Sequence, residues 1–245
     1  MLLAVDIGNT NISFGLFKAG KLKKRFSIPT QGYSFGRLKA HFTGPRPKRS
    51  VICSVVPGID PLINRDLRAL TAARPYNIGK QIKVPIKNLY RNPRQVGQDR
   101  LVNAYAGTLL FGAPLIVVDF GTAITFDVIS AKSEYLGGMI LPGLNLSLKA
   151  LNENTALLPR VKLTRPKEFI GKDTQSSILS GIVYGFASMS DDLIKRIKAR
   201  IGKNAKVIVT GGDSAILNKY CQRIDHFDPD LTLKGIYLLY NSLVD

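Results

Sequence analysis

A short motif that combines an Asp, a Gly and hydroxyl side chains occurs twice in this chain. The first copy, DIGNTNIS, starts at Asp6, and the second, DFGTAITF, starts at Asp119. In each copy an apolar run typical of a buried strand ends at the Asp, and a Gly follows two residues later. The Gly allows a tight turn whose amide and hydroxyl donors can hold phosphate oxygens. The carboxylate at the strand end can hold a cation beside them.

The repetition of this motif carries more information than either copy alone, because a single Asp-X-Gly predicts only a turn. Asp6 and Gly8 correspond to Asp119 and Gly121 at one constant offset of 113 residues. We therefore interpret the two copies as parts of a duplicated domain. We expect the two hairpins to face each other across a nucleotide cleft between two related halves.

A further carboxylate, Asp99, lies in the segment VGQDR, where a loop meets a predicted helix. It could simply cap that helix. A helix start also stabilises an ionised carboxylate, which could accept the proton of a substrate hydroxyl during phosphoryl transfer. Gly97 would permit close approach of a substrate, and Arg100 could pair with an anionic group. Tyr90, in the preceding loop, could contact a ligand or pack in the core.

Several classes of chemistry find no support in the sequence. There is no GxxxxGK[ST] motif, so a P-loop enzyme is not expected. The two histidines, His41 and His226, have neither a triad context nor zinc-ligand spacing. Two cysteines give no disulfide framework, and with no export signal we expect a cytoplasmic protein. No apolar run is long enough to span a bilayer, and no membrane partner is expected.

The formal net charge of +18 raises the question of a nucleic-acid partner. Basic residues occur in several separate segments without regular aromatic residues between them, among them 18–25, 37–49, 80–100, 160–172 and 195–206. We interpret them as a generally basic surface that attracts small anions such as ATP and carboxylates. Nucleic acid is therefore not the expected partner.

The 245 residues, 45% of them hydrophobic, predict an ordered α/β protein in which strands followed by helices occur twice. We place a domain boundary at Gly112-Ala113-Pro114, which gives domains 1–113 and 114–245. The segment 76–97 is expected to be an irregular loop near a site, and a further strand is expected near Tyr135. The pattern predicts strands at 2–6, 12–17, 22–28, 51–55, 115–119, 123–129 and 206–210, and helices at 34–42, 59–73, 99–111, 145–153, 175–200, 214–220 and 232–243.

Six segments together resemble the type III pantothenate kinase family. In order, they are DIGNTNISFGLF, VGQDRLVNAYAG, VVDFGTAITFDVI, YLGGMILPGLNLSLKAL, IGKDTQSSILSGIVYGF and VIVTGGDS. The resemblance runs from Asp6 to about Asp213. It implies two related actin-like (ribonuclease H-like) domains and a homodimer. The implied reaction is ATP-dependent phosphorylation of pantothenate to 4'-phosphopantothenate, the first step of coenzyme A biosynthesis.

The resemblance also implies roles for matching residues. Asp99 would be the catalytic base, Asp119 a ligand of a monovalent cation (K⁺ or NH4⁺), and Asp6 would lie near the Mg²⁺-bound phosphates. The ATP-binding residues would be Asp6, Ile7, Gly8, Asn9, Thr10, Asn11, Ile12, Ser13 and Thr122. The pantothenate-binding residues would be Tyr90, Gly97, Gln98, Asp99, Arg100 and Thr174. After Thr174, residues 175–177 depart from the usual pattern of the family.

Two alternatives stay open at this point. One is a non-enzymatic transcriptional accessory factor that binds nucleic acid, and the other is a kinase for another small alcohol. The joint presence of Asp6, Asp99, Arg100 and Asp119 favours an enzyme over a regulator.

Overall fold

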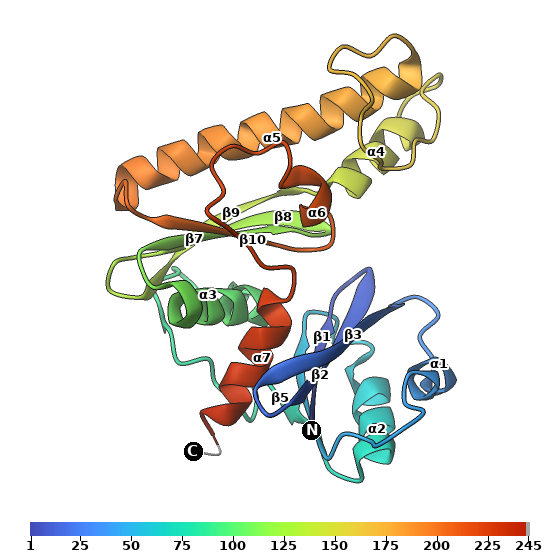
Figure 1. The fold of residues 1–245 in the computed structure, drawn as a ribbon, viewed down its shortest axis with the longest axis vertical. Coiled ribbons are helices and arrows are strands. Elements are labelled where there is room, and N and C mark those ends of the chain that lie inside the picture. The colour runs from blue at the N-terminus through green and yellow to red at the C-terminus, as the bar shows by residue number, and fades with distance from the viewer. Residues whose placement is uncertain (244–245) are drawn as a thin grey trace. The chain divides into compact units, whose positions relative to one another are not determined.

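The structure, a computed structural model, describes residues 1–243, which form two compact units. The first unit contains residues 1–86, 91–106 and the chain from Leu231 onward, and the second contains 87–90 and 107–230. Each unit has one sheet with helices packed on it (Figure 1), which confirms the predicted α/β class. The division into domains 1–113 and 114–245, and the nucleotide cleft between the halves, stay predictions.

The sheet of the first unit has the strand order β3-β2-β1-β4-β5. Its strands are β1 (Leu2–Ile7), β2 (Asn11–Lys18), β3 (Lys21–Pro29), β4 (Arg49–Ser54) and β5 (Tyr76–Asn77). The first three are antiparallel neighbours, whereas β4 runs parallel to β1 and β5 runs parallel to β4. Asp6 therefore lies near the same end of the sheet as the end of β4.

Both faces of this sheet are covered, because successive side chains of β1 point to opposite sides and nearly all are apolar. One face packs in a cluster with α2 (Asp60–Thr71) and with Leu38 of α1 (Phe35–Ala40). The other packs against α7 (Leu231–Asn241) and the first part of α3 (Gln98–Phe111). The burial of both faces fixes the position of the strand end that carries Asp6.

The sheet of the second unit has the order β11-β10-β7-β8-β9-β6. Its strands are β6 (Lys87–Asn88), β7 (Leu115–Phe120), β8 (Ala123–Ile129), β9 (Glu134–Pro142), β10 (Lys206–Thr210) and β11 (His226–Phe227). Apart from β6, the order and the directions repeat those of the first unit, with β7 in the place of β1. The repeated topology agrees with the duplication that the two motifs indicated.

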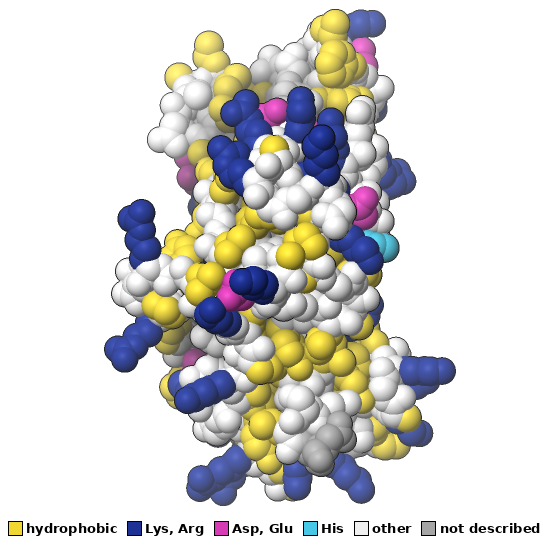
Figure 2. All heavy atoms as spheres, turned by 90° about the vertical axis from the view of Figure 1, so that its left-hand side faces the viewer, with side chains coloured by type: hydrophobic (Ala, Val, Ile, Leu, Met, Phe, Trp, Pro, Cys, Tyr) yellow, Lys and Arg dark blue, Asp and Glu magenta, His cyan; other side chains and the backbone are white. Residues whose placement is uncertain are grey.

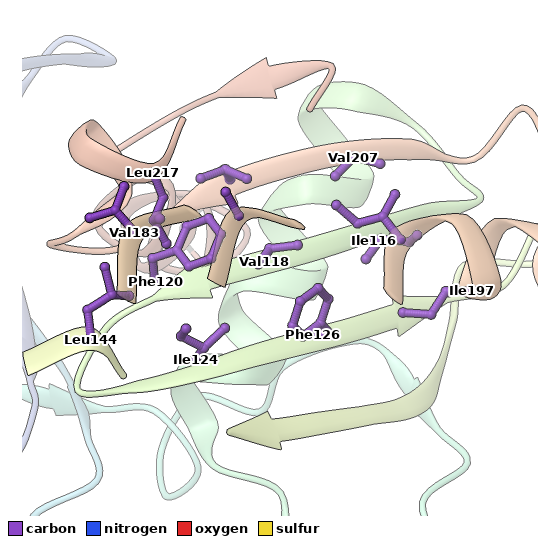
Figure 3. Packing of buried hydrophobic residues seen from close by; sticks show 13 residues of the cluster. Ile116, Val118, Phe120, Ile124, Phe126, Leu144, Val183, Ile197, Val207 and Leu217 are labelled. Atoms are coloured by element: carbon purple, nitrogen blue, oxygen red, sulfur yellow. The ribbon is translucent and has the colours of Figure 1, made fainter. Parts of the chain in front are cut away.

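A long helix, α5 (Thr174–Ile201), packs on one face of this second sheet together with α4 (Leu144–Glu153) and α6 (Ser214–Leu217). The apolar residues of β7, β8 and β10 point toward residues of α5, as Figure 3 shows for Phe120, Phe126 and Val183. All three side chains are fully buried. This core holds the end of β7, and with it Asp119, in a fixed position.

Two sequence expectations need correction. The segment 76–97 is not wholly irregular, because it contains β5, β6 and a 3-10 turn at Pro93–Gln95. The helix expected at 214–220 ends at Leu217. The backbone pairing that forms the two short strands comes from β4 and β9, which the local sequence does not contain. Within residues 1–243, no helix combines the length and the apolar character that a bilayer span requires.

Candidate active site

The turn after β1 is held in place by hydrogen bonds from a neighbouring strand. The Gly8 N–H donates to the Asn11 carbonyl at 3.0 Å, which closes the turn. Thr30, which follows β3, donates its Oγ1 to the Gly8 carbonyl at 2.7 Å and its N–H to the Thr10 carbonyl at 2.9 Å. Residues 9–11 are exposed, and Asp6 is half-buried just before the turn. The turn thus presents exposed amides and polar side chains from a fixed backbone.

Three carboxylates of the first unit surround one buried thiol. Cys53 of β4 pairs in register with Asp6 of β1, and its side chain is fully buried. Burial raises the pKa of the Cys53 thiol, and the charges of Asp6, Asp99 and Asp60 raise this pKa further. Because such charge effects fall off with distance, the predicted base Asp99 lies in the same electrostatic neighbourhood as Asp6.

Asp99 lies within the first turn of α3, whereas an N-cap residue lies just before the first turn. Asp99 is therefore not the N-cap of this helix. Its Oδ1 accepts a hydrogen bond from the Arg100 N–H at 2.8 Å. Burial raises the pKa of the Asp99 carboxyl, and the backbone bond and the charge of Arg100 lower it by a smaller amount. Burial therefore makes Asp99 a stronger base than an exposed aspartate, in a position where a hydrogen-bond donor orients it.

Two glycines make room for the side chains at the start of α3. A Cβ atom on Gly97 would lie 2.5 Å from Asp99 Oδ1, so a larger residue would displace the carboxylate. Gly79 has φ +83°, and a Cβ there would lie 2.9 Å from Gln98 Cδ. The structure therefore brings together the predicted residues Gly97, Gln98, Asp99 and Arg100, and it adds Gly79, which the sequence analysis did not identify.

The equivalent turn of the second unit follows β7. The Gly121 N–H donates to the Ala123 carbonyl at 3.2 Å, and the Gly143 N–H donates to the Thr122 carbonyl at 3.0 Å. Gly143 has no space for a side chain, because a Cβ would collide with the carbonyl oxygens of Gly121 and Thr122. Thr122 itself is exposed and half-buried Asp119 precedes it in the strand. This turn is therefore anchored by the start of α4.

A second anchor of this turn is the segment Gly211-Gly212-Asp213. Gly211 has φ +96° and contacts the Asp119 carboxylate closely enough that a Cβ would collide with it. The Asp213 N–H donates to the Phe120 carbonyl at 2.9 Å. Asn145 Nδ2 of α4 donates to both carboxylate oxygens of Asp213, at 3.1 and 3.0 Å. Burial raises the pKa of Asp213, and the Asn145 bond lowers it by less.

Asn145 was not identified from the sequence, because its partner lies 68 residues away. The only local signal is its position two residues after Gly143, in the first turn of α4. The Asn145–Asp213 pair joins the two segments that pack around Asp119. It is therefore part of the structure that positions this carboxylate.

Tyr90 lies against the glycine run of β9 in the second unit. A Cβ on Gly137, which has φ +124°, would lie 3.4 Å from a ring carbon of Tyr90. The Tyr90 N–H donates to Asn88 Oδ1 at 2.9 Å, and the Leu89 N–H donates to the Tyr135 carbonyl at 2.8 Å. Gly137 therefore gives the aromatic ring a flat surface, and the short strand β6 fixes its place.

Thr174 is the first residue of α5, and the residue that caps this helix is Asp173. The Ser176 N–H donates to Asp173 Oδ1 at 2.8 Å, and the Asp173 N–H donates to Ser176 Oγ at 3.1 Å. The helix cap is therefore Asp173, and the Thr174 side chain is not used for it. Thr174 is exposed and lines a cavity of about 700 Å³ at the start of α5, together with Ile178.

The carboxylate at the end of β1 suits a Mg²⁺ ion that ATP helps to bind. Mg²⁺ keeps several waters and is usually held by one or two carboxylates together with substrate phosphates. Asp6 is half-buried beside a turn with exposed polar residues. No cluster of three or more His, Cys, Asp or Glu side chains suited to a metal occurs in residues 1–243. Asp6 therefore fits a metal whose remaining ligands are phosphate and water oxygens.

Comparison with known proteins identifies close relatives. The model of the family described as type III pantothenate kinase matches residues 2–196. A type III pantothenate kinase from Persephonella marina is 42% identical over 256 residues, which cover 98% of each chain.

Solved structures show the fold at lower identity. A conserved Baf family protein from Campylobacter jejuni is 23% identical with a TM-score of 0.64, over 99% of this chain and 98% of that chain. The activator of 2-hydroxyisocaproyl-CoA dehydratase from Clostridium difficile, with bound ADPNP, is 12% identical with a TM-score of 0.58, over 99% and 96%. These similarities confirm the actin-like ATPase and sugar kinase fold.

Proposed function

The chain belongs to the type III pantothenate kinase family, and we propose that Asp99 accepts the proton of the pantothenate hydroxyl in its reaction. The reaction is the ATP-dependent phosphorylation of pantothenate, the first step of coenzyme A biosynthesis. The observation that carries the proposal is the place of Asp99 in the first turn of α3, where the Arg100 N–H orients its carboxylate and burial raises its pKa.

In the proposed step, the hydroxyl proton of pantothenate moves to the Asp99 carboxylate while the hydroxyl oxygen forms a bond to the γ-phosphorus of ATP. The bond between that phosphorus and the bridging oxygen breaks, and ADP leaves. The hydrogen bond from the Arg100 N–H orients the carboxylate. Gly97 leaves the space in which the carboxylate lies, so the base stays aligned as the proton is transferred.

We assign the binding of ATP phosphate to the Asp6–Ser13 turn, because its backbone is fixed by Thr30 and its outer residues are exposed. When bound, Mg²⁺ would neutralise phosphate charge, with Asp6 as the nearest carboxylate of this turn. Thr122 would contact ATP from the second turn. Asp119, which Gly211 packs against, would hold K⁺ or NH4⁺.

The pantothenate contacts are proposed from residues of different chemical types. Buried Arg100 supplies a positive charge and Gln98 an amide at the start of α3. Tyr90 supplies a ring that rests on Gly137, and Thr174 supplies an exposed hydroxyl. A charge, an amide, a hydroxyl and an apolar ring match a substrate that has a carboxylate, an amide and hydroxyl groups.

A homodimer is the proposed assembly. The second unit exposes several large apolar side chains, among them Ile140, Leu157, Phe169 and Ile170, with exposed fractions of 64%, 91%, 68% and 76%. Two of them, Phe169 and Ile170, are neighbours in the chain, and a contiguous exposed apolar patch is typical of surfaces that associate. A cytoplasmic location stays a prediction from the sequence.

The test is a coupled assay of ADP formation with purified protein, with and without pantothenate, in potassium and then in sodium buffer. We expect turnover to require pantothenate and to fall when sodium replaces potassium. Equal turnover with other small primary alcohols would contradict the assignment of substrate. Equal turnover in the two buffers would contradict a selective cation role for Asp119.

A further inference from the structure

The excess of positive charge is concentrated in one part of the chain. Residues 7–98 contain 18 of the 35 Lys and Arg residues but only two of the 17 Asp and Glu residues, Asp60 and Asp66. Figure 2 shows a face of the molecule on which Lys and Arg side chains outnumber Asp and Glu. The segments that carry this charge are separate in the sequence, so only the register of the sheet reveals which of them are neighbours.

Strand register brings basic residues together at one end of the first sheet. Lys18 of β2 pairs with Lys21 of β3, and the preceding residue of β2, Phe17, pairs with Leu2 of β1. Leu2 also pairs with Arg49 of β4, and Lys48 donates its N–H to the Met1 carbonyl. Val51 pairs with Tyr76 of β5, so Arg74 continues the row beyond Arg49.

The row is therefore Lys21, Lys18, Lys48, Arg49 and Arg74, in the spatial order of the strands, with Lys48 beside the start of β1. All five side chains are exposed. With neighbouring strands about 4.8 Å apart, the row is about 19 Å long. It lies at the end of the sheet opposite the Asp6–Gly8 turn, because Asp6 is at the other end of β1.

The carboxylates of this unit do not neutralise the row. Among its described residues, the carboxylates are those of Asp6, Asp60, Asp66 and Asp99. Three of these are grouped around Cys53 near the other end of the strands. The fourth, Asp66, is 2% exposed and accepts hydrogen bonds from Arg65. The positive row therefore faces solvent without nearby acidic side chains from its own unit.

We propose that this row, which we call the basic edge (Lys18, Lys21, Lys48, Arg49 and Arg74), binds the phosphate backbone of a nucleic acid. One strand of a nucleic-acid helix carries a phosphate about every 3.4 Å along its axis, so about five phosphates extend over 19 Å. Contacts of this kind need only positive side chains at the correct spacing and are independent of base sequence. The binding is separate from the kinase reaction. It differs from the sequence-based expectation of no nucleic-acid partner, because strand register shows that separate basic segments meet at one end of the sheet.

An anionic membrane is a less suitable partner for the same charges. Stable binding to a membrane surface usually combines basic residues with apolar side chains that enter the acyl region. Of the large apolar side chains exposed in residues 1–243, only Leu243 belongs to the first unit. The basic edge thus offers charge without an apolar anchor, which suits a nucleic-acid backbone.

The experiment is a titration of full-length protein against fluorescently labelled oligonucleotides, single-stranded RNA and duplex DNA, at several salt concentrations. With about four phosphates neutralised, the Kd should rise roughly 10²-fold between about 50 and 200 mM salt. Saturating ATP should leave the Kd unchanged, because the Asp6–Gly8 turn lies at the other end of β1. Loss of oligonucleotide binding on addition of ATP would overturn the proposal, since it would place the oligonucleotide in the nucleotide site.

Two variants of equal charge separate the basic edge from net charge. One carries Lys18→Gln, Lys21→Gln, Lys48→Gln and Arg49→Gln. The control carries Lys162→Gln, Lys195→Gln, Lys203→Gln and Lys219→Gln, all exposed residues of the second unit. The first variant should lose the salt-dependent binding and keep pantothenate turnover, whereas the control should keep both. Equal loss in the two variants, no salt-dependent binding by the wild type, or tighter binding to vesicles with anionic lipid would each overturn the proposal.

Discussion

Replacement of Asp99 by Asn tests whether this carboxylate accepts the hydroxyl proton. Asn has nearly the same size, and its amide oxygen can still accept the bond that the Arg100 N–H donates at 2.8 Å. The substitution therefore removes proton affinity and charge while the packing around Gly97 is preserved. Loss of a well-placed general base lowers the rate by about 10²–10⁴, equivalent to about 3–5 kcal/mol of activation free energy. We expect kcat to fall within this range, with little change in the KM for ATP.

The thermal stability of Asp99→Asn shows independently whether a fall in kcat comes from the lost base or from a damaged fold. Burial raises the pKa of Asp99 in the folded protein above its value in the unfolded chain. The free energy of unfolding that this group contributes is therefore greatest at low pH and falls as the pH rises through the folded pKa. Asn does not ionise, so Asp99→Asn removes the destabilisation that the ionised carboxylate causes at neutral pH. The Tm of this variant at neutral pH should therefore equal or exceed that of the wild type. The acid limb of kcat/KM for the wild type should lie above the usual pKa of aspartate.

Asp66→Asn is the control, because Asp66 is a buried aspartate of the same unit that bonds to Arg65 and is not among the carboxylates whose charges act on Cys53. It should lower the Tm and keep kcat. Full kcat in Asp99→Asn, measured in the coupled assay with pantothenate, would refute the assignment of Asp99 as the base. A large drop in its Tm would instead show that Asp99 is mainly structural.

Two further substitutions test how the carboxylates are positioned. Gly97→Ala places a Cβ 2.5 Å from Asp99 Oδ1. We expect kcat to fall about 10²-fold, as for a catalytic group displaced by about 1 Å. The control Gly44→Ala, which has open space around its Cβ, should keep wild-type kcat. Equal kcat in these two variants would show that the contact with Asp99 is unimportant. Asn145→Asp places two carboxylates together and removes two hydrogen bonds, so the KM for ATP should rise on the order of tenfold. The double variant that carries both Asn145→Asp and Asp213→Asn exchanges the two side chains and should restore the KM. Failure of the exchange to restore the KM, with a normal Tm, would argue against the pair as a positioning device for the nucleotide site.

Most of the fold could be predicted from sequence because its main elements bury residues in regular patterns. The strands Leu2–Ile7 and Leu115–Phe120 are nearly all apolar and buried on both faces, and α5 has apolar residues at helical spacing. The strands β5, β6 and β11 have two residues each, and they exist only because β4, β9 and β10 offer backbone partners. A local pattern holds no information about such partners.

The candidate site also has a part that could be predicted from the sequence and a part that could not. Asp6, Asp99 and Asp119 could be found from residue type and from position at the end of a strand or the start of a helix. Contacts between distant segments could not be found, since Tyr90 meets Gly137 and Asn145 meets Asp213 only after the chain has folded. The glycines at these contacts signal close approach, but the sequence does not indicate which partner approaches.

The duplicated turn lies in two different electrostatic settings, and this difference argues against two equivalent catalytic halves. Cys53, on the parallel strand β4, is the register partner of Asp6. The charges of Asp6, Asp60 and Asp99 all act on the Cys53 thiol, so acidic groups are concentrated in this part of the first unit. Beside Asp119 the corresponding partner is Thr210, followed by Gly211, which contacts the carboxylate directly. The first setting concentrates negative charge, whereas in the second Asp119 packs against the Gly211 backbone and the nearby Asp213 carboxylate is bonded by Asn145. Because proton transfer needs a base of raised pKa and a cation site needs a fixed carboxylate, this difference fits the separate tasks proposed for the two units.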